Sequence, residues 1–202
     1  MKELLERLTS DFDDAEGWIR IVDADWFADD LRLSLSIKFN DESEAELWKI
    51  ECTGVFEESL SSEGTELLSL SLESPLLKPY IEKEVDLMFS ENSLAPEFLF
   101  GLVCSCCIEI MGKPNYIKKL LNLQPTVRGI ASSTYGKLGC FPESVANNIV
   151  NSLQNQPIKI NALPGREPKH WTGSEFLSFP MLKALEIGES YVIGESFSAN
   201  RA

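Results

Sequence analysis

The chain has 202 residues, of which 44% are hydrophobic and 25% are charged, and this composition is typical of a globular protein rather than a disordered one. A chain of this length buries about 70% of the surface that its unfolded form exposes, so it needs no disulfide or metal to fold. The formal net charge of −14 argues against nucleic acid or an anionic membrane as a partner.

The negative charge lies almost entirely in the first half of the chain. Residues 1–97 contain 8 Lys/Arg and 25 Asp/Glu, a charge of −17, whereas residues 98–202 contain 10 Lys/Arg and 7 Asp/Glu, a charge of +3. A charge that served only solubility would not need to be confined to one half. This asymmetry points to a function for the acidic half.

The sequence predicts a cytoplasmic protein that does not enter a membrane. The segment Met1–Arg7 lacks the apolar core of a signal peptide and has the pattern of a short amphipathic helix. The longest apolar run, residues 98–111, contains Glu109 and is shorter than the roughly 20 residues that cross a bilayer. Without an export signal, the five cysteines are expected to be reduced thiols.

The acidic half has the alternation of an antiparallel sheet. In residues 31–39, five apolar residues alternate with four polar ones, which places all the apolar side chains on one face. Further strands are expected at residues 18–23, 48–57, 68–73 and 84–89, with a turn at 40–43. No segment of helical crossover length separates these strands, so we predict a β-meander that the strand at 84–89 closes.

The second half is predicted to be mainly helical. Helices are expected from Pro96 to residue 111, over 115–123 and over 143–154, followed by a short strand at 157–160 and a β-hairpin at 185–195. The fold class is therefore α+β, with helices packed on one face of the antiparallel sheet and a C-terminal β-hairpin. We predict a single domain over residues 1–202, with a strand-rich part (1–92) and a helix-rich part (93–202).

The cysteine cluster Cys104, Cys106 and Cys107 has the wrong spacing for a zinc site. Structural zinc is held by four ligands, usually two separated pairs, and here three thiols fall within one turn of an apolar helix. Cysteine also packs as a small hydrophobic residue. We therefore predict core packing for these residues, and no metal site or cofactor.

Two other segments contain residue types that occur in catalytic or phosphate-binding sites. Cys140 and His170 are a Cys–His pair that could act as nucleophile and base, and the helix start at Pro142 could lower the pKa of the thiol. Nothing in the sequence places the two residues together, so no catalytic residue is predicted and a thiol enzyme is kept as an alternative. In residues 129–139, Gly136-Lys137 is not followed by Ser or Thr, so a structural or recognition loop is favoured over a phosphate-binding loop.

Two acidic turns are the candidate binding surface. In the first, four aspartates flank the aromatic pair Trp26-Phe27, so that aromatic area is combined with carboxylates that attract a basic partner. Residues 23–30 lack the spacing of a calcium loop, and a solvated turn between strands is the alternative. The predicted partner-binding residues of the two turns are Asp23, Asp25, Trp26, Asp29 and Asp30, then Asp41, Glu42 and Glu44.

Three stretches resemble patterns found in the immunity proteins of bacterial polymorphic toxin systems, including those of contact-dependent inhibition. They are Trp48–Val55, Ser74–Tyr80 and Gly136–Pro142, which leads into a helix. The resemblance implies a cytoplasmic inhibitor that binds one cognate toxin and blocks its active site. It assigns no functional residue in this chain.

Charge and resemblance together predict an acidic protein-binding module, an immunity-type inhibitor whose partner is a toxin with a basic surface. A nuclease toxin has a basic groove for phosphate, for which an acidic surface can compete. The alternatives are the Cys140–His170 thiol enzyme and an adaptor or chaperone-like subunit with several partners. The sequence leaves the oligomeric state open.

Overall fold

The computed structural model describes residues 1–12, 17–39, 44–112 and 132–202, and it forms two compact units. Unit 1 consists of Met1–Leu77 together with Pro180–Ala202, and unit 2 consists of Lys78–Phe179. Unit 2 is therefore inserted into the chain of unit 1. The prediction of a single domain stays a prediction, but the division at residue 92 does not coincide with a boundary between these units.

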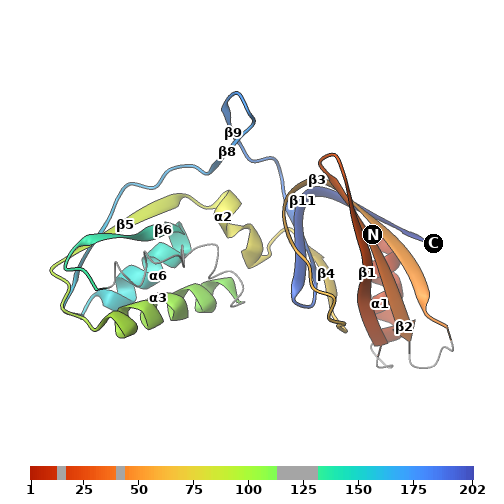
Figure 1. Ribbon diagram of the computed structural model, residues 1–202, viewed down its shortest axis with the longest axis horizontal. Coiled ribbons are helices and arrows are strands. Elements are labelled where there is room, and N and C mark those ends of the chain that lie inside the picture. Colours follow the sequence, from red (N-terminus) through yellow and green to blue (C-terminus); the bar gives the residue numbers. More distant parts are fainter. Residues whose placement is uncertain (13–16, 40–43, 113–131) are drawn as a thin grey trace. The chain divides into compact units, whose positions relative to one another are not determined.

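Unit 1 is built on one antiparallel sheet with the strand order β1-β2-β3-β11-β10-β4. Its described elements are α1 (Lys2–Phe12), β1 (Gly17–Phe27), β2 (Asp30–Phe39), β3 (Glu46–Ser59), β4 (Leu68–Ser71), η1 (Pro75–Leu77), β10 (Lys183–Ile187) and β11 (Ser190–Arg201). The C-terminal hairpin β10–β11 lies between β3 and β4, so the last residues of the chain complete the sheet that the first residues begin (Figure 1).

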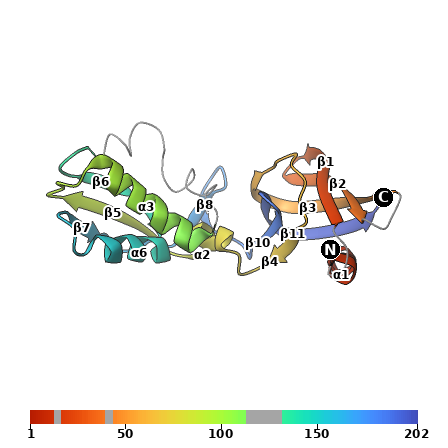
Figure 2. The ribbon, with the colours of Figure 1, turned by 90° about the horizontal axis from the view of Figure 1, so that it is seen from below.

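The two edges of this sheet are joined by a single bridge. The backbone amides of Ile19 on β1 and Thr65, just before β4, each donate to the other residue's carbonyl, at 2.7 and 2.8 Å. The sheet therefore curls towards a barrel (Figure 2). Gly64 fits beside this bridge because a Cβ there would lie 1.9 Å from Nε1 of Trp18.

The core of unit 1 follows from the alternation in β2 and β3. The alternating apolar residues of β2, from Leu31 to Phe39, and Trp48, Ile50 and Cys52 of β3 point to the inner face and are buried, whereas Leu47 of β3 is exposed on the outer face. Leu4 and Leu8, one helical turn apart on α1, join the same core. The buried cluster also contains Ile19, Leu31, Leu33, Leu35, Ile37, Phe39, Trp48, Ile50, Cys52, Leu185, Ile187, Val192 and Ala199.

Unit 2 is a smaller α+β layer. Its described elements are α2 (Lys78–Ile81), β5 (Glu84–Ser90), α3 (Pro96–Met111), β6 (Gly136–Pro142), α6 (Glu143–Leu153), β7 (Lys159–Ala162), β8 (Lys169–Trp171) and β9 (Phe176–Ser178). The strands pair antiparallel in the order β6-β5-β7, and β8 pairs with β9 in a separate hairpin. Helix α6 contacts all three strands of the sheet and α3 packs against α6, on the same side of the sheet (Figure 1).

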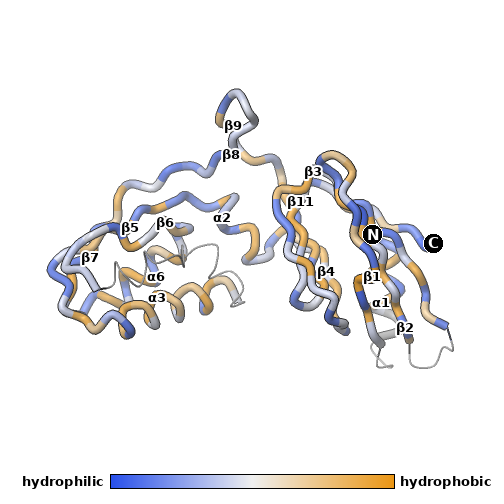
Figure 3. The backbone as a smooth tube through the Cα atoms, in the orientation of Figure 1, coloured by the Kyte–Doolittle hydropathy of each residue, from blue (hydrophilic) through white to orange (hydrophobic). Residues whose placement is uncertain are grey.

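Helix α3 is apolar over most of its surface (Figure 3). Its buried residues, among them Leu99, Val103 and Cys107, lie on one side, and it ends at Gly112, which has a φ of 75°. With 16 residues it is the longest helix of the described chain. No helix in the described ranges combines the length and the apolar character needed to cross a bilayer.

The α+β class, the antiparallel meander β1-β2-β3 and the C-terminal hairpin are confirmed. Two details were wrong. The strand expected to close the meander, β5, pairs instead with β6 and β7 in unit 2. Of the loop expected over residues 129–139, residues 136–139 belong to β6 (Gly136–Pro142). The turn expected at 40–43 and the helix expected at 115–123 lie outside the described residues.

Candidate functional site

The end of the β1–β2 hairpin, residues 22–30, is called the hairpin tip. A register shift between Ile21 and Asp23 makes Val22 an extra residue on β1, and from Val22 onward every residue of β1 is exposed. Trp26 is 51% exposed and Phe27 is 66% exposed. Ala28 turns the chain with a φ of 54°, so the tip is a defined turn.

The two aromatic side chains of the hairpin tip lie on opposite faces of the hairpin. Residues that face each other in an antiparallel pair share a face. Trp26 faces Leu31, which is buried in the core, whereas Phe27 faces Asp30 on the outer face. The tip therefore presents one aromatic ring on each side rather than a single aromatic patch.

The outer face next to the hairpin tip has mixed charge. Asp23 faces Ser34 and Asp25 faces Arg32, and these residues line a surface depression of about 420 Å³ that also includes Lys49. This arrangement places cations directly beside the predicted carboxylates. Sequence reasoning missed it because the cations come from neighbouring strands, although the alternation of β2 and β3 already placed them on the polar face.

Arg32 is the centre of this mixed-charge face. Its Nε lies 3.8 Å from the Glu51 carboxylate, and its guanidinium carbon lies 5.3 Å from the centroid of the Phe27 ring. All of these groups are exposed, so each interaction is worth no more than about 1 kcal/mol. Their combined effect is to hold Phe27 against the sheet while its outer side stays in solvent.

Asp30 has a structural role in the turn. Its Oδ1 accepts a hydrogen bond from the Gly54 amide at 3.2 Å, and the Asp29 carbonyl accepts one from Val55 at 3.2 Å. Burial, together with the negative charge of Asp30, raises the pKa of the Cys52 thiol to about 12. Asp29 is exposed at the turn, so it remains a candidate for partner contact.

Glu44, the described residue of the second acidic turn, is separated from the hairpin tip by the full length of β2. Asp41 and Glu42 lie outside the described residues, and Glu44 is exposed just before β3. The ten residues of β2, at about 3.3 Å each, put roughly 30 Å between its two ends. Glu44 and the hairpin tip therefore do not form a continuous patch.

The acidity belongs to unit 1. Unit 1 contains 8 Lys/Arg and 23 Asp/Glu, a formal charge of −15, whereas unit 2 contains 10 Lys/Arg and 9 Asp/Glu, a charge of +1. The hairpin tip thus extends from a strongly negative unit whose long-range field favours positively charged partners.

The chain matches no protein-family model, no curated protein and no solved structure among those compared. The resemblance to immunity proteins therefore stays a prediction.

Cys140 lies on β6 in an environment that opposes its use as a nucleophile. Burial and a hydrogen bond with Asp86 raise the pKa of its thiol, and Arg166 Nη2 lies 4.0 Å from the sulfur. The expected lowering by the N-terminus of α6 is therefore wrong in direction. That N-terminus is occupied by Glu82, whose Oε2 accepts a hydrogen bond from the Ser144 amide at 2.8 Å.

His170 is placed by aromatic contacts on β8. Its ring centroid lies 5.1 Å from that of Phe179, which in turn lies 5.0 Å from that of Tyr80. Tyr80 is 8% exposed, so it supports this set of rings from a buried position. These contacts give His170 a packing role in the hairpin β8–β9.

The cysteines of α3 pack as predicted. Cys106 and Cys107 are buried and Cys104 is half-buried. Burial, followed by the proximity of the other two thiols, raises the pKa of Cys107 to about 12. Among the described residues, no group of three or more His, Cys, Asp or Glu side chains is arranged to hold a metal ion.

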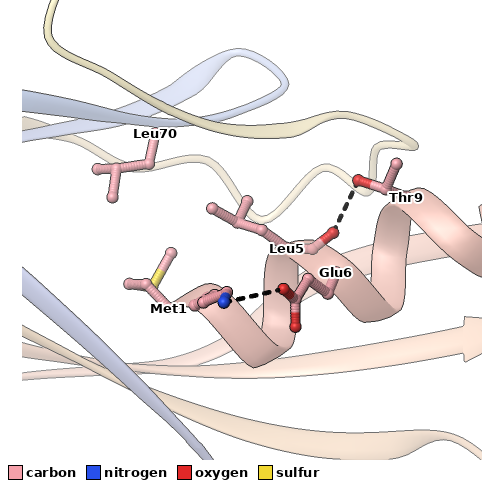
Figure 4. A pocket seen from close by; sticks show the side chains of 6 residues that line it. Met1, Leu5, Glu6, Thr9 and Leu70 are labelled. Carbon is pink, nitrogen blue, oxygen red and sulfur yellow. Dashed lines mark hydrogen bonds and ion pairs between the residues drawn. The ribbon is translucent and has the colours of Figure 1, made fainter.

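A second surface feature of unit 1 is an open groove of about 580 Å³ between α1 and β4. Met1, Leu5 and Thr9 line it from the helix and Leu70 lines it from the strand, with the Lys2–Glu6 ion pair at its side (Figure 4). Its walls are mainly aliphatic. Local sequence patterns do not predict this groove, because its two sides are more than 60 residues apart in the chain.

Proposed function

We propose that this protein binds a partner protein with a basic surface, and that the hairpin tip makes the central contact. The observation that carries the proposal is the run of exposed residues from Val22 to Phe27, which ends in two exposed aromatic rings on a unit of charge −15. Such large exposed rings on an ordered turn are the kind of side chain that dominates binding free energy at interfaces.

The aromatic and the acidic residues of the hairpin tip contribute differently to binding. Phe27 and Trp26 supply the area that is buried, and as ring side chains with two rotatable bonds they lose little conformational entropy on binding. Asp23, Asp25 and Asp29 are exposed, so they act mainly on the rate of encounter rather than on the lifetime of the complex. Asp30 keeps the turn in place through its bond to Gly54.

The finer proposal is that the partner is a cognate toxin, such as a nuclease with a basic groove, and that binding neutralises it. A narrow acidic projection can enter a groove that normally holds phosphate, since it offers carboxylates in place of the natural anion. The negative field of unit 1 raises the association rate, which matters for an inhibitor that must bind before the toxin acts.

Site-specific photo-crosslinking in the native host tests this proposal. A photoreactive residue at position 27 should join the chain to one abundant partner, and the same residue at position 44 should not, because Glu44 lies at the other end of β2. Mass spectrometry then identifies the partner and shows whether its contact surface is basic. Equal crosslinking from both positions, or an acidic partner surface, would overturn the proposal.

A further inference from the structure

The outer edge of β1 has no strand beside it along the hairpin tip. In the described part of the chain, β1 pairs with β2 on one side and meets Thr65 on the other side through Ile19 alone. From Val22 to Phe27 every residue of β1 is exposed. Strands of about five or six residues are the commonest in proteins, so this open edge is long enough to pair with another strand.

The register of the hairpin defines which main-chain groups point to the open edge. Phe27 and Asp30 close a two-residue turn, and the pair that closes such a turn is hydrogen-bonded within the hairpin. Hydrogen-bonded pairs then recur at every second residue, so the main-chain groups of Asp23 and Asp25 also point to β2. Those of Ala24 and Trp26 point to the open edge.

The main-chain hydrogen bonds at the start of β1 lead to the same assignment. Ile19 exchanges both of its hydrogen bonds with Thr65, at 2.7 and 2.8 Å, so its main-chain groups point away from β2. The extra residue Val22 shifts the alternation by one position. Beyond the bulge it is therefore Ala24 and Trp26, and no longer the odd-numbered residues, whose amides and carbonyls point away from β2.

The side chains along this edge select the kind of strand that can pair with it. Edge strands are commonly protected by lysine or proline, and the sequence from Val22 to Phe27 contains neither. Its only charges are Asp23 and Asp25 on the outer face, which repel the same edge of a second copy and attract lysine or arginine. Among the described residues no cation forms an ion pair with these two carboxylates, since Arg32 pairs with Glu51.

We propose that the partner adds one antiparallel strand to the open edge of β1, with basic residues opposite Asp23 and Asp25. This inference rests on the proposed function and specifies how the partner is held. Main-chain hydrogen bonds to Ala24 and Trp26 give the affinity, and the alternate side chains give the specificity. Apolar residues of the added strand face Ala24 and Trp26, so the bound segment alternates basic and apolar residues.

The antiparallel direction follows from the sheet and from the charges. Every strand pair of the unit 1 sheet is antiparallel, and antiparallel pairing is slightly more stable per residue than parallel pairing. On the open edge, residues opposite Asp23 and Asp25 fall in the non-hydrogen-bonded pairs of an antiparallel ladder. Side chains lie closest together in such pairs, which favours ion pairing between a lysine and each aspartate.

A synthetic peptide tests the edge without the native partner. The full chain, labelled with ¹⁵N, is titrated with a peptide of about eight residues that alternates lysine and valine. The amide signals of Ala24 and Trp26 should shift and their hydrogen exchange should slow, whereas the Glu44 amide should not change. A peptide that alternates glutamate and valine should bind at least about tenfold more weakly. Equal binding of the two peptides, or no binding of the lysine peptide, would overturn the proposal.

N-methyl groups on the peptide test the geometry without altering the protein. In the antiparallel arrangement the valine amides donate to β1, whereas the lysine amides point away from it. Methylation of two valine amides should weaken binding at least about tenfold, and methylation of two lysine amides should change it less than about twofold. Equal effects of the two peptides contradict an added strand, and a loss caused only by lysine methylation contradicts the antiparallel direction.

The native partner separates this inference from the proposed function. Ala24→Pro removes an amide on the open edge, where proline is tolerated, and Ala24→Ser is the control that keeps it. For a basic partner crosslinked from position 27, Ala24→Pro should weaken binding at least about tenfold and Ala24→Ser should not. Circular dichroism verifies that both variants are folded. If that partner binds Ala24→Pro as tightly as wild type, the proposed function stands and the added strand is wrong. If position 27 crosslinks to no partner, the proposed function itself fails.

Discussion

Nη2 of Arg201 lies 3.1 Å from Oε1 of Glu46, and this contact ties the last strand of the chain to β3. The Glu46 side chain is only 3% exposed, and it also accepts hydrogen bonds from Arg7 on α1 at 3.1 Å and from the Trp48 indole at 2.9 Å. A buried carboxylate with these three donors is fully paired. It joins the helix, the centre and the C-terminal strand of unit 1.

Replacing this carboxylate should destabilise unit 1. Glu46→Gln removes the negative charge that pairs with Arg7 and Arg201, so the free energy of unfolding should fall by about 1–3 kcal/mol. This loss is smaller than the roughly 3–5 kcal/mol expected for breaking a fully buried pair, because both arginines are partly exposed. Urea unfolding at pH 7 measures the difference, and Glu51→Gln is the control, since Glu51 is in an exposed ion pair with Arg32.

The same carboxylate predicts a pH dependence. Burial acts to raise the pKa of Glu46, but the hydrogen bonds from Trp48 and Arg7 and the two arginine charges outweigh it, so its pKa is lowered. A lowered pKa in the folded state adds stability above the ordinary pKa of the group, and this is lost as the pH falls through the lowered value. Between about pH 5 and pH 3, wild type should therefore lose more stability than Glu46→Gln. Parallel curves for the two proteins would contradict this account.

The Ile19–Thr65 bridge, where the two edges of the curled sheet meet, should be sensitive to the addition of a single methyl group. Gly64→Ala places a Cβ 1.9 Å from Nε1 of Trp18, so the indole must move away from the Ile19–Thr65 bridge. We expect a loss of about 1 kcal/mol and faster hydrogen exchange at the Ile19 amide. Gly101→Ala on α3 is the control, because among the described residues nothing beyond its own helix backbone and chain neighbours lies within 4 Å of the added Cβ, and it should be neutral or stabilising.

The elements that could be predicted from sequence are those specified by local pattern. The alternation of residues 31–39 identified β2, and the apolar run closed by Gly112 identified α3, because burial and capping act over a few residues. The partners of each strand could not be predicted in this way. Strand β5 has the same alternation as β2, and only long-range pairing with residues 136–142 places it in unit 2.

In the candidate site, too, local pattern predicts the turn but not which strands lie beside it. The position and exposure of Trp26 and Asp29 at the hairpin end followed from the turn signal, whereas the cations beside Asp23 and Asp25 depend on strand register. The sequence pattern predicts Asp30 as a partner-binding carboxylate. In the fold, however, Asp30 Oδ1 accepts a hydrogen bond from the Gly54 amide on β3. The charge of a segment such as residues 23–30 therefore overstates how acidic its immediate surroundings are in the folded protein.

The binding function proposed here and the thiol-enzyme alternative make opposite predictions for the reactivity of Cys140. Because burial and Asp86 raise its pKa, the thiol should react with iodoacetamide at pH 7 more slowly than a free cysteine does, and His170→Ala should not change the rate. Mass spectrometry of the alkylated peptide measures this rate. Fast alkylation that disappears in His170→Ala would favour the enzyme instead.

The insertion of unit 2 predicts that unit 1 folds alone. Ser71 on β4 pairs directly with Ala184 on β10, so a short turn can join the two strands in place of residues 78–179. The shortened chain should give a dispersed amide NMR spectrum and retain the Ile19–Thr65 bridge. Collapse of the spectrum would show that unit 1 depends on unit 2 for its fold.

The most direct test of the proposed function is the salt dependence of association with the crosslinked partner, measured by stopped flow. Asp23→Asn/Asp25→Asn/Asp29→Asn should slow association about tenfold or more at low salt and flatten its dependence on ionic strength, while Glu44→Gln should leave both unchanged. If the triple variant associates as fast as wild type with the same salt dependence, the hairpin tip does not guide binding to a basic partner.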